Sequence, residues 1–506
     1  LLLSVAVPTI RRELLLGCFL FGLSGGYYQF VRDDYEHHRQ SLIDDSDLLC
    51  RVLNVESKRA EIELVGRADQ RNHWSRYPNL YKLNFKLQSP VIPAIGDHLL
   101  LLNARISTLH ESANEIDFDL HSYLLGNNSL GYVYADDYQI IRSRSSYRFF
   151  LVKLANRLRQ KWSTNAANWF HPKLFEIYNA AFLGNKTMAG SKLKETFSKL
   201  GIMHVLSVSG MHVGLVYVFV FAPFRWLGRF YQPIMSFEIV FLPVIWIYAL
   251  ASGFAEPVFR ASMLISLMVI SRVLLQRKLR IEDAFFSVLL LSLIQNPLRI
   301  HSVSFQLSNA AMLGILFIYP IWKQKVATPY GVFNRMTDII GISVCCSLST
   351  LPLVLYYFHR FPLWFLLGNL VFTLPFTLLM FGFMSFSLMT LFELDLGMGF
   401  LADGLEMIWD RSLCMLERLA LLPNPYLFAY EFDGKQAYVL VCLLWLSWFV
   451  QTRFSTFKGS ILLGSSFVLL LFWGSLNSHK TTQMKYRFPQ KQKEINHIYR
   501  YAQSRN

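Results

Sequence analysis

The sequence predicts a polytopic α-helical membrane protein with about ten transmembrane helices and a small all-β, OB-like extramembrane domain. Of the 506 residues, 53% are hydrophobic and only 16% are charged, whereas soluble domains carry nearer a quarter of charged residues. Apolar runs of roughly 17–25 residues recur along the chain, each long enough to cross a hydrocarbon core of about 30 Å. One segment, 32–140, instead shows the period-two alternation of β-strands.

The N-terminal segment 1–31 is predicted to hold the first transmembrane helix, from about Leu14 to Val31, after the end of an earlier helix at 1–7. Arg11 and Arg12 precede this span. Because basic residues favour the cytoplasmic side, the following residues 32–203 are expected on the outer face.

Segment 32–140 is predicted to be the OB-like β-barrel domain on that outer face. In LYKLNFKL (80–87), apolar side chains alternate with lysine and asparagine, and the same alternation appears in EIEL (61–64) and IDFDLH (116–121). With 49–55 and 97–107 there are about five strands, enough for a small closed barrel. The segment holds 11 Lys and Arg against 17 Asp and Glu, a net charge of −6 that disfavours strong phosphate binding.

Segment 141–203 is predicted to form basic amphipathic helices at the membrane surface, with 12 Lys and Arg against two Glu, a net charge of +10. On a helix, its apolar residues Phe150, Leu151, Leu154, Leu158 and Trp162 share one face. The basic residues on the remaining surface, here called the basic collar, are Arg148, Lys153, Arg157, Arg159 and Lys161. This pattern suits an interfacial helix on anionic lipid, and equally a collar that attracts a polyanion.

A transmembrane core is predicted over 204–391, with spans at 204–224, 237–252, 257–271, 281–296, 304–322, 339–358 and 363–391. Basic loops fall on alternate sides, which agrees with residue 204 starting outside. Beyond it we expect an amphipathic helical segment at 392–435, two transmembrane helices at 436–477 and a basic tail at 478–506. Pro375 leaves two readings of 363–391: one tilted span, which we favour, or a broken helix that reverses the topology after it.

The stretch HVLSVSGMHVGL (204–215) combines two features if it is one helix. Ser207, Gly210 and Gly214 form a small-residue seam for close helix packing, whereas His204, Ser209 and His212 occupy another sector. A helix polar on both sides cannot face lipid, so it is expected inside a bundle. Two packed, hydrogen-bonded histidines explain the second sector as well as a watery path does.

Polar residues enter other predicted spans. Glu256 and Arg260 are four residues apart at the start of one span, Gln306 opens another, and Asn369 lies in the last. Each alone is typical of helix–helix contacts, but together they indicate a bundle with a hydrated interior.

Five blocks carry a family resemblance: AAFLGNKT (180–187), GIMHVLSVSGMHVGL (201–215), EPVFRASM (256–263), NPLRIHSVSFQLSNAAMLG (296–314) and STLPLVLYYFHRFPLWFLLGNLVFTLP (349–375). In these blocks and in their order, the chain resembles the ComEC family of competence proteins, inner-membrane channels that take up single-stranded DNA during natural transformation. Asn185 stands where the family usually has Asp, which puts any role of that carboxylate in doubt.

The resemblance implies a multi-pass protein of the bacterial inner membrane, with the β domain on the periplasmic side, that conducts single-stranded DNA into the cytoplasm. The chain shows no HxHxDH cluster of the family's metallo-β-lactamase-like domain and no P-loop, so we expect a form without that domain. The implied partners are the DNA strand, the lipid bilayer, a DNA receptor on the outer face, a cytoplasmic helicase-type motor and a separate nuclease. No enzyme activity, metal or cofactor is expected.

The residues predicted to line the DNA path are His204, Ser209, His212, Arg260, Gln306 and Asn369. Two other classes of function stay open. One is a transporter of small molecules or lipid-linked substrates. The other is an intramembrane serine hydrolase built on Ser207-Val208-Ser209-Gly210, which lacks the leading glycine and the AHxxG histidine of rhomboid-like proteases.

Overall fold

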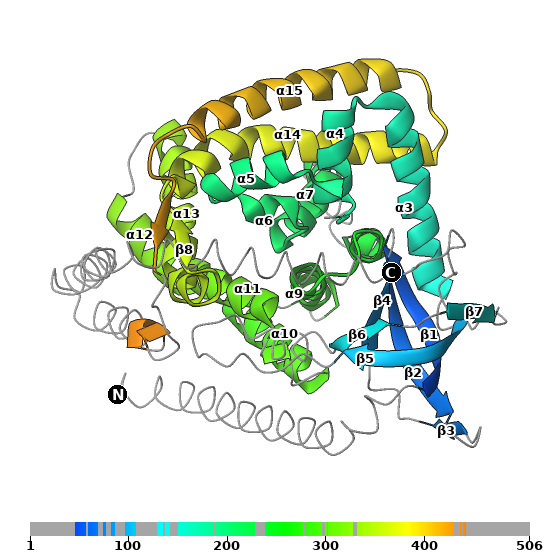
Figure 1. Ribbon diagram of the computed structural model, residues 1–506. Coiled ribbons are helices and arrows are strands. Elements are labelled where there is room, and N and C mark those ends of the chain that lie inside the picture. Colours follow the sequence, from blue (N-terminus) through cyan, green and yellow to red (C-terminus); the bar gives the residue numbers. More distant parts are fainter. Residues whose placement is uncertain are drawn as a thin grey trace.

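The computed structural model of the protein is mostly helical, with a small β domain near its N-terminus (Figure 1). It describes residues 46–56, 59–68, 74–76, 82–86, 97–107, 129–134, 137–141, 150–185, 188–227, 238–274, 276, 279–295, 299–300, 302–326, 331–429, 436–437 and 439–441. The predicted spans of segments 1–31 and 436–477, the tail 478–506 and the strand at 116–121 lie wholly or largely outside these residues.

The strands of the β domain pair in a ring. They are β1 (Ser46–Glu56), β2 (Arg59–Ala68), β3 (Trp74–Arg76), β4 (Lys82–Lys86), β5 (His98–Ser107), β6 (Ser129–Tyr134) and β7 (Asp137–Ile141). Pairings run β1–β2–β4–β6–β5, and β5 pairs back with β1; β3 extends β2, and β7 extends β5. All pairs are antiparallel except β4–β6, which is parallel. A closed ring leaves few exposed strand edges.

The alternation seen in the sequence explains the interior of this ring. Leu48, Cys50 and Val52 of β1 are buried, and Leu99 and Leu101 of β5 are buried opposite them. Successive side chains of a strand point to opposite faces, so these alternate residues form one apolar layer. The strands predicted at 49–55 and 97–107 are β1 and β5.

The helical part follows the predicted order. Its helices are α3 (Phe150–Trp169), α4 (Pro172–Ile177), the π-helix η2 (Tyr178–Phe182), α5 (Ser191–Lys199), α6 (Met203–Leu206), α7 (Gly210–Leu227), α8 (Leu242–Ala251), α9 (Glu256–Val273), α10 (Ile281–Gln295), α11 (Val303–Leu313), the π-helix η6 (Gly314–Ile318), α12 (Tyr319–Val326), α13 (Gly331–Phe358), α14 (Phe365–Leu391) and α15 (Met398–Leu419). Two short strands, β8 (Arg360–Pro362) and β9 (Tyr426–Phe428), pair antiparallel.

Three described helical stretches are long and apolar enough to cross a membrane: Val303–Val326, Met336–Phe358 and Phe365–Leu391. Gly210–Ala222 and Glu238–Ala251 are shorter apolar helices. The described part of the chain therefore supports a membrane protein, while the total of about ten spans stays a prediction.

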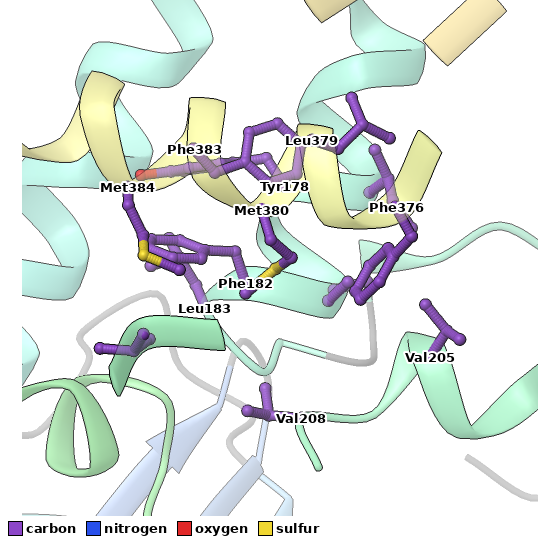
Figure 2. Close-up of a cluster of buried hydrophobic side chains, with 14 of the residues drawn as sticks. Tyr178, Phe182, Leu183, Val205, Val208, Phe376, Leu379, Met380, Phe383 and Met384 are labelled. Atoms are coloured by element: carbon purple, nitrogen blue, oxygen red, sulfur yellow. The ribbon is translucent and has the colours of Figure 1, made fainter. Parts of the chain in front are cut away.

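The helical core is an aromatic cluster between η2 and α14 (Figure 2). The Tyr178 ring meets the Phe383 ring edge-on at 5.1 Å between centroids and stacks on Phe182 at 5.3 Å. The Tyr178 hydroxyl also lies 2.9 Å from the Ser387 hydroxyl. Segment 141–203 is thus more than a surface helix, because η2 is completely buried and builds the core beneath α14.

α14 is one unbroken helix of 27 residues that contains Pro375, as the reading with a single span predicts. At 1.5 Å per residue it is about 40 Å long. α15 packs along it, with Leu405 seated against Gly382. The chain then returns to the start of α14, where β9 pairs with β8. Segment 392–428 therefore does not stay at the far end of α14, because α15 runs back beside it (Figure 1).

Candidate functional site

The HVLSVSGMHVGL stretch is not one helix. α6 ends at Leu206, Ser207 has extended backbone angles (φ −109°, ψ 131°), and α7 begins at Gly210. The prediction of a continuous span at 204–224 is therefore wrong. Because the break changes the direction of the chain, Ser207 does not share a helical face with Gly210 and Gly214, and the seam does not form as one stripe.

The three seam residues have separate surroundings. A Cβ on Gly210 would lie 3.3 Å from the Cβ of Ala261 and 3.8 Å from the carbonyl oxygen of Pro257, so α7 approaches α9 closely at this point. A Cβ on Gly214 would meet no described atom within 4 Å. Of these two glycines, only Gly210, at the start of α7, lies at a close approach to another helix.

Ser209 and His212 cap the start of α7. The Ser209 N–H donates to Nδ1 of His212 at 3.1 Å, and the His212 N–H donates to the carbonyl oxygen of Ser209 at 3.1 Å. The Ser209 hydroxyl lies 2.9 Å from the same Nδ1. The bond from the Ser209 N–H to the His212 ring matches one half of a capping box, in which a side chain three residues into the helix bonds back to the N–H of the first residue.

The predicted path residues His204, Ser209 and His212 differ in how far they are exposed. The imidazole of His212 is fully buried and meets the Phe376 ring of α14 edge-on at 5.1 Å. Ser209 is half-buried, and His204 on α6 is exposed. In this conformation His212 is a packed capping residue, and only His204 and Ser209 have solvent-accessible surface.

Arg260 belongs to a charged cluster between α9 and α11. Its Nη1 lies 3.7 Å from Oε2 of Glu256, and its guanidinium lies over the Phe305 ring at 4.8 Å from the centroid. Arg299 reaches the other oxygen of Glu256, with 2.9 Å between Nε and Oε1. The i,i+4 pair predicted from the sequence is thus extended by Arg299, which the sequence analysis missed because it lies 39 residues beyond Arg260.

Gln306 is bonded at both ends of its amide. Its Nε2 donates to the carbonyl oxygen of Ile300 at 2.8 Å, and its Oε1 accepts from the Tyr357 hydroxyl at 2.8 Å. It therefore ties α11 to α13. Asn369 lies half-buried on α14, seven residues before Phe376 and hence on the same side of that helix.

The structure brings four of the six predicted path residues into one region. Ser209 and His212 open α7, which contacts α9 beside Arg260, and the Arg260 guanidinium contacts Phe305, the residue before Gln306. Asn369 reaches this region only through α14, about 10 Å along the helix from Phe376.

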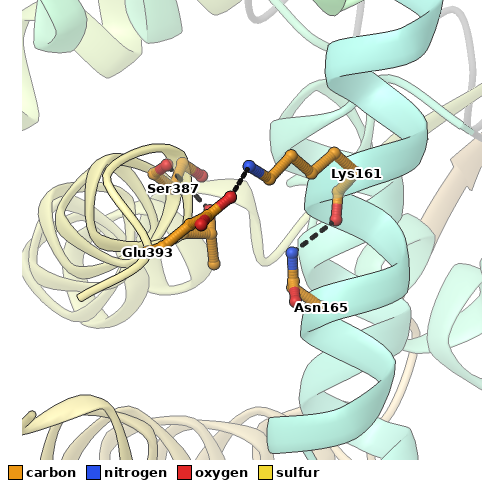
Figure 3. A network of polar contacts seen from close by, with 5 residues as sticks. Lys161, Asn165, Ser387 and Glu393 are labelled. Carbon is orange, nitrogen blue, oxygen red and sulfur yellow. Dashed lines mark hydrogen bonds and ion pairs between the residues drawn. The ribbon is translucent and has the colours of Figure 1, made fainter. Parts of the chain in front are cut away.

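Two members of the basic collar make structural contacts. Nε and Nη2 of Arg159 both donate to the carbonyl oxygen of Leu183, at 2.9 and 2.6 Å. Lys161 forms an ion pair with Glu393 at 3.0 Å, just beyond the end of α14 (Figure 3). A planar guanidinium that grips one carbonyl fixes the loop after η2, so Arg159 is a clamp rather than an open cation.

The remaining collar residues differ in placement. Lys153 is half-buried and Arg157 is exposed on α3, whereas Arg148 lies outside the described residues. Phe150, Leu151 and Leu154 on the same helix are exposed, as an interfacial helix requires.

The Ser209–His212 contact lacks part of a hydrolase site among the described residues. A nucleophilic serine needs a base whose far nitrogen is oriented by a third group. Nε2 of His212 is buried with no such group among the described residues, and Nδ1 already accepts the Ser209 N–H. The described part of the chain also holds no group of three or more His, Cys, Asp or Glu that could bind a metal ion.

Comparison with known proteins places this region in a family. The family model described as "Competence protein" matches residues 182–455. The chain is 27% identical to ComE operon protein 3 of Bacillus subtilis over 213 residues, which are 42% of this chain and 25% of that protein. It is 25% identical to Recombination protein 2 of Haemophilus influenzae over 294 residues, 55% of this chain and 32% of that protein.

An uncharacterised protein of Aquifex aeolicus is 29% identical over 203 residues, which are 40% of this chain and 45% of the relative. The chain thus matches less than half the length of each of these relatives. No solved structure matches it significantly.

Proposed function

The chain belongs to the Competence protein family, which is implicated in DNA uptake, and from this premise we propose that it is a membrane channel for single-stranded DNA. The family match carries the proposal, since it covers the helices from α6 to α15 that hold the polar residues described above. The strand would enter a bacterial cell across the inner membrane during natural transformation.

The charged cluster of Glu256 and Arg260 on α9 with Arg299 before α11 supports this proposal. DNA carries a negative charge on every phosphate, and its passage through a bundle requires cations that replace water and counterions. Glu256, Arg260 and Arg299 together bear a net charge of +1 inside the bundle. A carrier of neutral solutes would have no need for this excess of positive charge.

We assign the β domain to the outer face and to the OB type. In chain order, the five strands of the ring are β1, β2, β4, β5 and β6. β1 pairs with both β2 and β5, and β4 pairs with β6 in parallel. OB folds are five-stranded Greek-key barrels whose members bind oligonucleotides. The net charge of −6 over 32–140 favours a gating or docking role for this domain over strong DNA binding.

The proposed partners are those that the resemblance to the competence family implies. We propose that a DNA receptor delivers the strand on the outer face, that a helicase-type motor pulls it from the cytoplasm, and that a separate nuclease removes the other strand. The basic helix α3, with its exposed apolar residues, would lie on anionic lipid beside the entrance.

The test is DNA uptake in a transformable bacterium whose own gene of this family is deleted. With this chain supplied, labelled DNA is expected to become protected from external nuclease in spheroplasts. Without it, DNA should bind to the cell but stay nuclease-sensitive. Equal protection in the two strains would refute the channel.

A further inference from the structure

The guanidinium of Arg260 is buried without hydrogen bonds. The residue is only 7% exposed, and neither Nη1 nor Nη2 has a hydrogen-bond partner in the described part of the chain. The nearest carboxylate oxygen, Oε2 of Glu256, is 3.7 Å from Nη1 and also accepts no hydrogen bond. A buried charged donor left unsatisfied in this way is costly, so a native structure that keeps one usually has a use for it.

The geometry around Arg260 suits a bound anion. Arg260 and Arg299 share a single carboxylate, so one of the two positive charges is uncompensated within the cluster. Phe305 lies against the Arg260 guanidinium and Phe259 against that of Arg299, at 4.8 and 5.5 Å. An aromatic ring on the face of a guanidinium does not use its N–H donors, and the N–H edge matches two oxygens of a phosphate. Nη1 and Nη2 of Arg260 are buried in this conformation, so the side chains around them must separate when a phosphate binds.

We propose that Arg260 and Arg299 form a binding site for one phosphodiester group of single-stranded DNA, and that Glu256 occupies this site when no strand is present. The inference rests on the proposed function. A phosphodiester carries one negative charge, which equals the excess charge of the cluster. When the phosphodiester binds, its oxygens accept hydrogen bonds from Nη1 and Nη2 of Arg260, while Glu256 keeps its contact with Arg299.

Phosphate is favoured over a metal or a neutral ligand by the donors themselves. A guanidinium has no acceptor and repels cations, and its planar fork pairs with phosphate or carboxylate through two hydrogen bonds. Glu256 acts as an internal competitor, which keeps the buried arginines from holding any one phosphate too tightly. Weak, exchangeable contacts are required where a charged polymer must keep moving.

The experiment measures the affinity of the purified full chain, in a maltoside detergent that contains no phosphate, for a thymidine oligonucleotide of about 16 nucleotides. Each phosphate contact contributes about 0.7 to the slope of log affinity against log salt for a single strand. Arg260→Gln is expected to reduce this slope by about 0.7, which between about 50 and 200 mM salt is roughly a 2.6-fold change. Arg260→Lys should reduce it less.

Arg272→Gln is the matched control on the same helix. It removes an arginine bonded to both oxygens of Glu238, at 2.9 and 3.2 Å, and should leave the slope unchanged. A second variant protects the test if Arg260→Gln fails to fold: Glu256→Gln removes the competitor and should raise affinity and steepen the slope. A peptide nucleic acid of the same sequence, which has no phosphates, should bind all variants equally.

An unchanged slope in Arg260→Gln and in Glu256→Gln would overturn the site and make the cluster a structural ion pair. So would an Arg260-dependent slope seen with phosphatidylglycerol but not with the oligonucleotide. Either result would leave the proposed channel untouched, because DNA uptake is tested separately by the nuclease protection of labelled DNA in spheroplasts. Conversely, normal uptake without this chain would refute the channel even where the slopes change as expected.

Discussion

Replacing Gly184 by alanine should destabilise the protein strongly, although the change adds a single methyl group. Gly184 follows η2 and has a positive φ of 75°. A Cβ built on it would lie 2.2 Å from the carbonyl oxygen of Ser252, which is closer than any real contact of this kind. The loop cannot shift easily, because Arg159 grips the preceding carbonyl, that of Leu183, with two hydrogen bonds.

The magnitude follows from two costs. The left-handed conformation costs an L-residue about 1–2 kcal/mol. Forcing extra volume into a packed interior costs about 1–3 kcal/mol more. We therefore expect Gly184→Ala to lower the free energy of unfolding by roughly 2–5 kcal/mol.

Gly214→Ala is the matched control, since it adds the same methyl group to the apolar helix α7. No described atom lies within 4 Å of the position that its Cβ would take. Alanine is the better helix former by about 0.5–1 kcal/mol, so this variant should be slightly more stable than the wild type. The seam predicted from the sequence would require the opposite result, a loss of stability.

The measurement is unfolding of the purified protein in mixed micelles as the fraction of dodecyl sulfate rises, followed by far-ultraviolet circular dichroism. Gly184→Ala should unfold at a lower fraction of dodecyl sulfate than the wild type, and Gly214→Ala at an equal or higher one. Equal midpoints for the two variants would refute the reasoning, because the substitutions differ only in backbone conformation and in the space available.

Three further outcomes are expected. Ser209→Ala should cost about 1 kcal/mol of stability, because it removes the hydrogen bond between the Ser209 hydroxyl and Nδ1 of His212, yet retain DNA uptake; loss of uptake in a variant that folds normally would contradict a purely structural role. In variants that each keep one cysteine, a maleimide should label Cys414, which is exposed on α15. It should not label Cys50 in the native protein, because complete burial raises the pKa of that thiol. Rapid labelling of Cys50 would show that the β domain opens. Arg159→Lys should destabilise the protein by about 1.5–3 kcal/mol, because an ammonium cannot form the two hydrogen bonds that the guanidinium donates to the carbonyl of Leu183. Arg157→Lys, on the exposed side of α3, should change the stability little. Equal effects of the two substitutions would contradict the structural role of Arg159.

The helix and strand positions could be predicted from the sequence because their signals are local. Alternation placed β1 and β5, and runs of apolar residues placed α9, α10 and α14 to within two residues at each end. The family also followed from short blocks of residues, and the later match over 182–455 agrees with that resemblance. Such patterns depend on neighbours within one or two turns, so no tertiary information is needed to read them.

The site depended on the tertiary structure. A helical wheel drawn through 204–215 assumes one continuous helix. Only the folded chain shows that a new helix, α7, begins at Gly210, where the His212 ring accepts the N–H of Ser209. Likewise, the five arginines and lysines of the basic collar looked equivalent in the sequence, yet only the folded chain shows that Arg159 binds the carbonyl of Leu183 and that Lys161 pairs with Glu393.

By itself, the sequence determined that this is a helical membrane protein with an N-terminal β domain and the motif blocks of the competence family, because hydrophobic periodicity and motif blocks are properties of neighbouring residues. Only the tertiary structure decided that Arg299 shares Glu256 with Arg260 and that the guanidinium of Arg260 is left buried and unbonded. That arrangement joins residues on α9 to one that precedes α11, and burial and pairing of charge exist only once the two helices pack.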